Sequence, residues 1–329
     1  MDIINNDHIK LINNTINNLN SEGIFFFISD RKYSKFVSPL TSSINLFAKN
    51  WLIIYIQIGC FSFDFKKKDN LIEIGIDIPS NIKNKNELKI FSANIRVPIL
   101  FEFTSKINTN KIIYSDVDNI LINNINSIFN EKRIYLRQVR ENLIEKKFID
   151  NSKFMQYKSG IIILKASDNK YLRNDSIITS FVESYYFACI PDFDKWFSDQ
   201  IALTKTFNEN PELIKYTFFN KKICDWDLNP SSYFWAAKGY IKDTLLWKII
   251  SLKNIIIFNL KLLIEGHNNR LYISIIYVID RFLKFFIFPL IVLRLKLINF
   301  CFRFIRFTFK KIIKLFKFLI KNLLNLLSN

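Results

Sequence analysis

The chain has 329 residues, with 47 Lys and Arg against 29 Asp and Glu, and a formal net charge of +18. Half of the residues are hydrophobic and 16% are aromatic, which argues against general disorder. The six glycines form neither of the two common nucleotide-binding glycine patterns. With only two histidines, a Ser-His-Asp triad or a multi-histidine zinc site is not expected. The four cysteines include no C-x-x-C, which indicates a reducing compartment.

Residues 1–22 form a polar, Asn-rich segment without the features of a cleaved signal peptide. Beyond it, short apolar runs alternate with helical stretches. Strands are predicted at 24–28, 51–57, 71–78, 112–114 and 160–164, helices at 34–48, 88–103, 171–187 and 196–207, and a further ordered segment at 128–138. This alternation predicts an α/β domain over 23–250, with a Rossmann-like, mostly parallel sheet covered by helices on both faces.

Residues 251–329 differ in charge, because 14 basic residues face 2 acids there, a net of 14 − 2 = +12. Their longest uncharged runs, 271–279 and 285–293, are too short to cross a bilayer, which takes roughly 20 apolar residues. A stripe of basic residues spaced by three or four lies among large apolar ones: Arg303, Arg306, Lys310, Lys314, Lys317 and Lys321.

We therefore predict that 251–329 is a helical, basic amphipathic extension, with 281–326 lying on an anionic membrane surface. This predicts a cytoplasmic protein, peripheral on the inner face of the membrane. The alternative is a C-terminal helix that packs its apolar face on the α/β domain. A nucleic-acid partner is not expected, since the basic residues alternate with large aliphatic ones.

Two carboxylates, Asp116 and Asp118, follow the predicted strand 112–114 directly. Ligands of open α/β sheets bind outside the carboxyl ends of strands. Paired like charges repel unless a cation or protons relieve them, and a hard divalent metal holding a phosphate would do so. The motif therefore indicates metal–phosphate chemistry, with a solvated turn as the alternative.

The order of strand, Asp116-Val-Asp118, apolar stretch and Ile125–Phe129 resembles the GT-A nucleotide-sugar glycosyltransferases, particularly the family-eight-like bacterial polysaccharide and lipopolysaccharide enzymes. The resemblance covers about residues 22–245. It implies Mn²⁺ or Mg²⁺ at Asp116 and Asp118. It also implies transfer from a nucleotide-sugar donor, a UDP-sugar, to a glycan or lipid-linked acceptor with retention of anomeric configuration.

Other stretches extend the resemblance to the donor site. Segment 27–33 resembles the first strand and nucleotide-binding turn, which implies that Asp30 and Tyr33 contact the base. Arg96 lies before the metal strand, where the family has an arginine that reaches the donor. Gly160 matches the glycine of the family's Asn-Ala-Gly, although Ser159 replaces its alanine. For Asp30 and Tyr33, the alternative is an ordinary polar turn. For Arg96, it is a position on a solvated helix face.

Two later motifs complete the resemblance. Asp199 and Gln200 match a D-Q-x-x-L element, which implies a catalytic place beside the transferred sugar; an exposed helix face is the alternative. Lys238 and Gly239 resemble the part of the family's closing element that binds the diphosphate.

The closing element lacks the histidine that completes the family's metal shell, so Asp225 or Asp227 is a candidate third ligand. Two other functions stay open. In a haloacid-dehalogenase-like phosphohydrolase, Asp116 would be the nucleophile and Asp118 the general acid/base. That motif is usually N-terminal, whereas about 90 residues of α/β sequence precede it here. The second is a non-catalytic, membrane-bound protein on a transferase fold.

Overall fold

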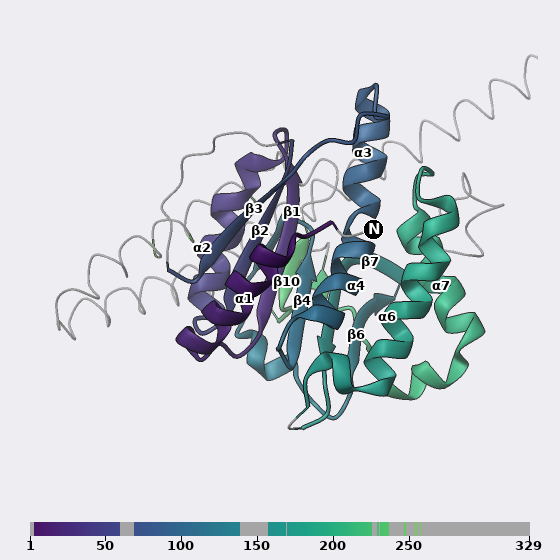
Figure 1. The fold of residues 1–329 in the computed structure, drawn as a ribbon. Helices are drawn as coiled ribbons and strands as arrows, with labels where there is room; N and C mark the ends of the chain where they lie inside the picture. Colours follow the sequence, from purple (N-terminus) through teal and green to yellow (C-terminus); the bar gives the residue numbers. More distant parts are fainter. Residues whose placement is uncertain are drawn as a thin grey trace, which may run out of the picture. The chain divides into compact units, whose positions relative to one another are not determined.

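A seven-stranded sheet forms the centre of the fold in the computed structural model (Figure 1). The structure describes residues 3–59, 69–138, 157–168, 170–225, 229, 231–236, 247, 254 and 257. In chain order the strands of this sheet are β1 (Ile24–Asp30), β2 (Leu52–Ile58), β3 (Leu71–Ile76), β4 (Lys111–Ser115), β6 (Ile134–Gln138), β7 (Tyr157–Lys165) and β8 (Thr217–Phe219).

The spatial order of the strands is β3-β2-β1-β4-β7-β6-β8. β7 runs antiparallel to β4 and β6, and the other four neighbouring pairs are parallel. The predicted mostly parallel α/β sheet is confirmed. A smaller sheet has the order β5-β10-β9, with β5 (Asn119–Leu121), β9 (Cys224–Asp225) and β10 (Phe234–Ala236).

Helices cover both faces of the large sheet because its central strands are apolar on both sides. Successive side chains of β1 point to opposite faces of the sheet. One buried cluster contains Ile24, Phe26 and Ile28, and another contains Phe25 and Phe27. The first cluster includes residues of α1 (Asn6–Leu19), α3 (Lys85–Asn94), α4 (Arg96–Lys106), α6 (Ser176–Cys189) and α7 (Ser198–Glu209), and the second residues of α2 (Val37–Phe47). Continuous apolar runs of this kind are typical of parallel strands buried on both faces.

Short 3₁₀ helices lie between these elements. They are η1 (Ser34–Phe36), η2 (Ile125–Ile128), η5 (Leu172–Asn174), η6 (Ile190–Asp192) and η7 (Pro211–Tyr216). The predicted segment 128–138 thus contains the end of η2 and all of β6. The predicted strand at 160–164 is the second half of the longer β7.

The N-terminal helix α1 was not predicted from the sequence. Asn5 caps it by accepting a hydrogen bond from the His8 amide at 2.8 Å, and its isoleucines enter the first cluster. Just before the helix, the buried carboxylate of Glu102 accepts the backbone N–H groups of Ile3 at 2.5 Å and Ile4 at 3.0 Å. These contacts anchor the start of the chain to α4.

Two predicted helices differ from the structure in ways that shape the site. The predicted helix 88–103 is two helices, α3 and α4, which meet at Ile95. Pro98 lies in the first turn of α4, where a missing N–H is tolerated, whereas a continuous helix would place its ring against the Asn94 carbonyl. The predicted helix 171–187 begins only at Ser176, because Asp175 caps it by accepting two backbone N–H groups.

The extension predicted at 251–329 lies outside the described residues, except for Asn254 and Ile257. Within the described part of the chain, no helix is both long enough and apolar enough to cross a bilayer.

Candidate functional site

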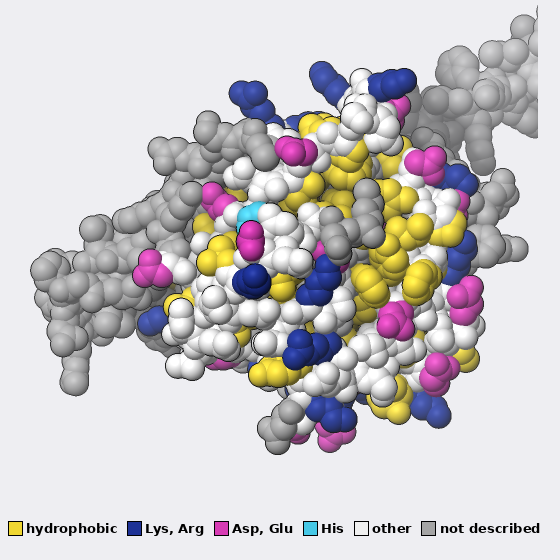
Figure 2. Space-filling view, in the orientation of Figure 1, with side chains coloured by type: hydrophobic (Ala, Val, Ile, Leu, Met, Phe, Trp, Pro, Cys, Tyr) yellow, Lys and Arg dark blue, Asp and Glu magenta, His cyan; other side chains and the backbone are white. Residues whose placement is uncertain are grey.

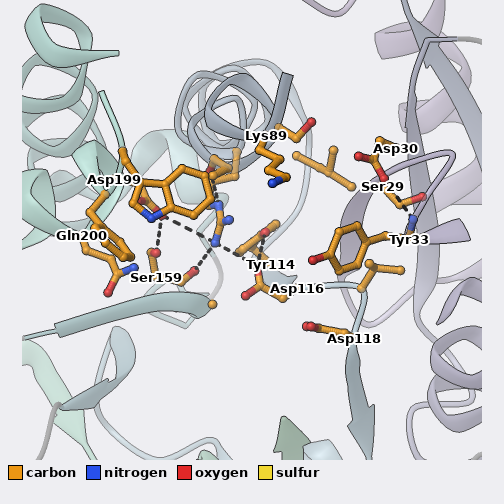
Figure 3. A pocket seen from close by; sticks show the side chains of 18 residues that line it. Ser29, Asp30, Tyr33, Lys89, Tyr114, Asp116, Asp118, Ser159, Asp199 and Gln200 are labelled. Atoms are coloured by element: carbon orange, nitrogen blue, oxygen red, sulfur yellow. Dashed lines mark hydrogen bonds and ion pairs between the residues drawn. The ribbon is translucent and has the colours of Figure 1, made fainter. Parts of the chain in front are cut away.

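A pocket of about 340 Å³ opens at the carboxyl ends of β1 and β4 (Figure 3). Asp30 is the last residue of β1, and Asp116 and Asp118 follow β4 directly. The opposite wall comes from the start of α4, from β7 and from the start of α7. Five chain segments thus meet at one edge of the sheet.

Eight of the ten predicted site residues line this pocket. They are Asp30, Tyr33, Arg96, Asp116, Asp118, Gly160, Asp199 and Gln200. The other two, Lys238 and Gly239, lie outside the described residues, as does Asp227.

Arg96 is the centre of the polar contacts in the pocket. Its Nη1 lies 2.9 Å from Asp116 Oδ1 and 3.6 Å from Asp199 Oδ2, and it donates to the Ser159 carbonyl at 3.2 Å. Its Nε donates to the Ala93 carbonyl. The planar fork of a guanidinium can serve several acceptors at once, which an ammonium group cannot do in the same plane. Arg96 therefore connects the segment after β4, through Asp116, to the start of α7, through Asp199.

Tyr114 completes this cluster from β4. Its hydroxyl donates to Asp116 Oδ1 at 2.7 Å, and the Arg96 guanidinium lies 5.0 Å from the centre of its ring. Burial raises the pKa of Tyr114 well above its usual value, against the opposing effect of Arg96, so the phenol remains a donor. Burial alone would lower the pKa of Arg96, but Asp116 and the other neighbours outweigh it and raise this pKa.

The start of α7 carries the predicted catalytic pair. Asp199 is buried, and its Oδ2 accepts the hydroxyl of Ser159 in β7. Gln200 accepts from Lys158 Nζ at 3.1 Å. Ser159, the departure from the family pattern, is thus the residue that fixes the Asp199 carboxylate.

The other side of the pocket carries Asp30 and Tyr33. Asp30 Oδ1 accepts the backbone N–H of Tyr33 at 2.9 Å, which closes the turn after β1. In Figure 3 these two residues lie opposite Asp199 and Gln200, with Asp116 between the two sides. These two pairs of residues therefore line opposite sides of the pocket.

The residues after β4 fit a hard divalent cation. The side-chain contacts of Asp116 to other described residues all go to Oδ1, which leaves Oδ2 for a metal. Mg²⁺ is commonly held by one or two carboxylates and by substrate phosphates. No group of three His, Cys, Asp or Glu suited to a metal occurs among the described residues. Asp225, proposed as a third ligand, is buried on β9, accepts the Asn229 amide at 2.7 Å and does not line the pocket.

Among the lining residues that were not predicted as site residues are Lys89 and Trp196. Lys89 precedes Arg96 by seven residues, a spacing that brings two side chains to the same side of a helix, and this could have identified it. Trp196 stands three residues before Asp199. Its exposure became apparent only once α7 was seen to begin at Ser198.

No protein-family model matches the sequence. No curated protein matches it significantly either. Among solved structures, the apo structure of WbbM, a bifunctional glycosyltransferase, is similar with a TM-score of 0.43 and 10% identity over 78% of this chain. The apo form of the glycosyltransferase GlyE of Streptococcus pneumoniae TIGR4 has a TM-score of 0.47 and 11% identity over 75% of this chain.

The galactosyltransferase LgtC, in complex with donor and acceptor sugar analogues, has a TM-score of 0.40 and 9% identity over 66% of this chain and 87% of its own. The chain spans 51% of the WbbM chain and 64% of the GlyE chain. All three of these similar structures are described as glycosyltransferases.

Proposed function

We propose that the chain is a metal-dependent glycosyltransferase of the GT-A type. It would move a sugar from a UDP-sugar donor to a glycan or lipid-linked acceptor, with retention of anomeric configuration. The observation that carries this proposal is the convergence of Asp30, Arg96, Asp116 and Asp199 on one pocket, from four separate segments. The resemblance implies that all four act on one donor molecule, with Asp30 at the base, Arg96 and Asp116 at the diphosphate, and Asp199 at the transferred sugar.

The donor would lie across the pocket, with its base at one side and its sugar at the other. Tyr33 would stack on the uracil while Asp30 accepts its N–H. Asp116 and Asp118 would hold Mn²⁺ or Mg²⁺, which would supply positive charge against the negative charge that develops on the diphosphate as the nucleotide leaves. Lys238 and Gly239 would contact the same diphosphate.

The transferred sugar would lie against Asp199 and Gln200. The Asp199 carboxylate is held by Ser159 and Arg96, so it presents a fixed acceptor to sugar hydroxyls. Arg96 would stabilise negative charge on the departing oxygens from the same place. Acceptor attack would then depend on positioning more than on covalent chemistry by the protein.

The acceptor is proposed from the composition of the C-terminal residues. A basic amphipathic segment at 281–326 would hold the enzyme on the anionic inner face of the membrane and so bring it to a lipid-linked acceptor. The expected partners are then the donor, the acceptor and this membrane surface, and not nucleic acid.

The test is a screen of nucleotide-sugar hydrolysis and transfer by the full chain, with and without Mn²⁺ or Mg²⁺. Release of nucleoside diphosphate should depend on the metal and should be lost in Asp116→Asn. Asp7→Asn is a matched control, because Asp7 is an exposed carboxylate at the start of α1 outside the pocket. It should behave as the unchanged chain.

Three results would contradict the proposal. Full metal-dependent transfer by Asp116→Asn would remove the metal assignment. Phosphate release from a simple phosphomonoester, without any sugar nucleotide, would favour the phosphohydrolase. Absence of UDP binding by calorimetry in the presence of Mn²⁺ would favour a non-catalytic protein.

A further inference from the structure

Trp196 is a large aromatic side chain exposed at the edge of the pocket. It lines the pocket and is 48% exposed, whereas other tryptophans such as Trp51 and Trp235 are buried. Exposed aromatic surface beside a polar pocket is a common mark of a ligand site.

The backbone on both sides of Trp196 is fixed by hydrogen bonds. The Asn94 amide, fully buried, donates to the carbonyls of Phe193 at 2.7 Å and Lys195 at 2.9 Å. The Ser198 hydroxyl donates to the Lys195 carbonyl at 2.8 Å. A backbone held in this way loses little conformational freedom when a ligand packs against the side chain that it carries.

Phe197, the next residue, has a left-handed backbone conformation with φ of 68°. A bulky residue adopts this conformation only where its surroundings impose it, and such sites cluster at ligand-binding positions. The Phe197 ring packs edge to face against the indole, with centroids 5.4 Å apart. The turn thus keeps the indole outside the core while Ser198 and Asp199 are buried behind it.

The position of Trp196 selects the part of the substrate it can meet. It is close in sequence to Asp199 and Gln200, which lie at the opposite side of the pocket from Asp30 and Tyr33 (Figure 3). The base of a nucleotide-sugar at Tyr33 would therefore be far from the indole, and the transferred sugar near it. The sugar ring of the acceptor, to which the first sugar is transferred, would lie at this edge.

We propose that Trp196 is the acceptor-binding platform, on which the apolar face of a pyranose ring stacks. This rests on the proposed function. The axial C–H groups of such a ring carry partial positive charge, and the face of an indole carries partial negative charge. The ring would be the terminal sugar of the glycan acceptor, and its stacking would determine which hydroxyl faces the donor.

The main competitor is insertion of Trp196 into a membrane. Hydrophobic side chains do gather elsewhere on the surface, over the area where α3, α4 and α6 lie (Figure 2), and Phe187 of α6 is 66% exposed. Trp196, however, borders a pocket that is also lined by the polar side chains of Asp199 and Gln200. A sugar ring has both an apolar face and hydroxyl groups, so it suits this position better than a lipid chain does.

The test measures binding of methyl β-D-glucopyranoside, methyl β-D-galactopyranoside and their N-acetylamino counterparts to the full chain by saturation-transfer NMR, in the presence of UDP and Mn²⁺. Trp196→Ala should bind the glycosides about tenfold more weakly. Trp196→Tyr should retain most of the binding. Phe187→Ala is the control, because it removes an exposed aromatic ring outside the pocket, and it should bind unchanged.

Calorimetry with UDP and Mn²⁺ separates the two proposals. If UDP binds equally to the unchanged chain and to Trp196→Ala, the proposed donor site is supported, and any change in glycoside binding then concerns the platform alone. Equal glycoside binding by Trp196→Ala, or no glycoside binding by the unchanged chain, would overturn the platform. Loss of binding to anionic phosphatidylglycerol vesicles by Trp196→Ala, with glycoside binding retained, would also overturn it and assign the residue to the membrane. If UDP binds neither protein, the proposed function itself fails.

Discussion

Replacing Arg96 by alanine would remove a guanidinium that contacts both Asp116 and Asp199. Arg96 and Asp199 are both buried, and Asp116 is 23% exposed at its side chain. The variant would leave two carboxylates in the pocket wall without their shared counter-charge. It would also leave the carbonyls of Ala93 and Ser159 without a donor that they have in the unchanged chain.

The expected loss of stability follows from these distances. At 2.9 and 3.6 Å, each ion pair is worth about 5 kcal/mol at an effective dielectric constant of about 20, before the desolvation of the charges is subtracted. Breaking a buried pair by removing one partner typically costs about 3–5 kcal/mol. Because water partly screens Asp116, we expect a loss of about 3 kcal/mol for Arg96→Ala. Arg96→Lys keeps the charge but loses the fork, and should lose about 1–2 kcal/mol.

Urea unfolding of the full chain at about pH 8 and about pH 5 is the assay. A buried carboxylate without a counter-charge takes up a proton more readily in the folded state than in the unfolded state. The folded variant then binds more protons than its unfolded form, so its stability falls as the pH rises. The deficit of Arg96→Ala should therefore be larger at pH 8 than at pH 5. A double-mutant cycle with Asp199→Asn should give a coupling of about 1–3 kcal/mol, since removing the charge of Asp199 removes part of the penalty.

Two results would refute this reasoning. A loss below about 1 kcal/mol would mean that the pair behaves like an exposed one. A deficit that does not change with pH would mean that it comes from lost packing of the guanidinium and not from unpaired charge.

Asn94→Ala should lower the free energy of unfolding by about 1 kcal/mol in urea, because two partly buried carbonyls lose their donor while the unpaired Asn94 Oδ1 disappears; unchanged stability would contradict the anchoring role. Burial, helped by Asp199, raises the pKa of the Cys189 thiol from about 9 to about 12. The thiol is neutral in both states below about pH 9, and above it only the unfolded chain ionises, so stability should fall by up to about 1.4 kcal/mol per pH unit up to about pH 12. Cys189→Ala should flatten the pH dependence of unfolding between about pH 9 and 10; equal slopes would count against it.

Much of the site was predictable because its residues are tied to local sequence signals. An apolar run followed at once by Asp116 and Asp118 predicts acids at the end of a buried strand, and Asp30 comes in the same way at the end of the apolar run of β1. Parallel strands bring their carboxyl ends to one edge of the sheet. Two acids some 85 residues apart could therefore be assigned to one pocket before any distance was known.

Other features depended on the tertiary structure. The isoleucines of α1 are buried by contacts with residues distant in the sequence. Part of segment 1–22, which was predicted as polar and Asn-rich, therefore belongs to the core. The turn at Phe197, held in part by Asn94, was equally hidden, because its partners are about 100 residues apart in the chain.

The sequence by itself determined the α/β alternation and the candidate acids, since both follow from short-range patterns of apolar and charged residues. The tertiary structure decided how those acids are held. Arg96 had been expected to reach toward a donor, and the structure shows it between Asp116 and Asp199, with Ser159 fixing the latter. Such contacts are set by the packing of β4, β7, α4 and α7, and a long-range ion pair leaves no local signature in the order of residues.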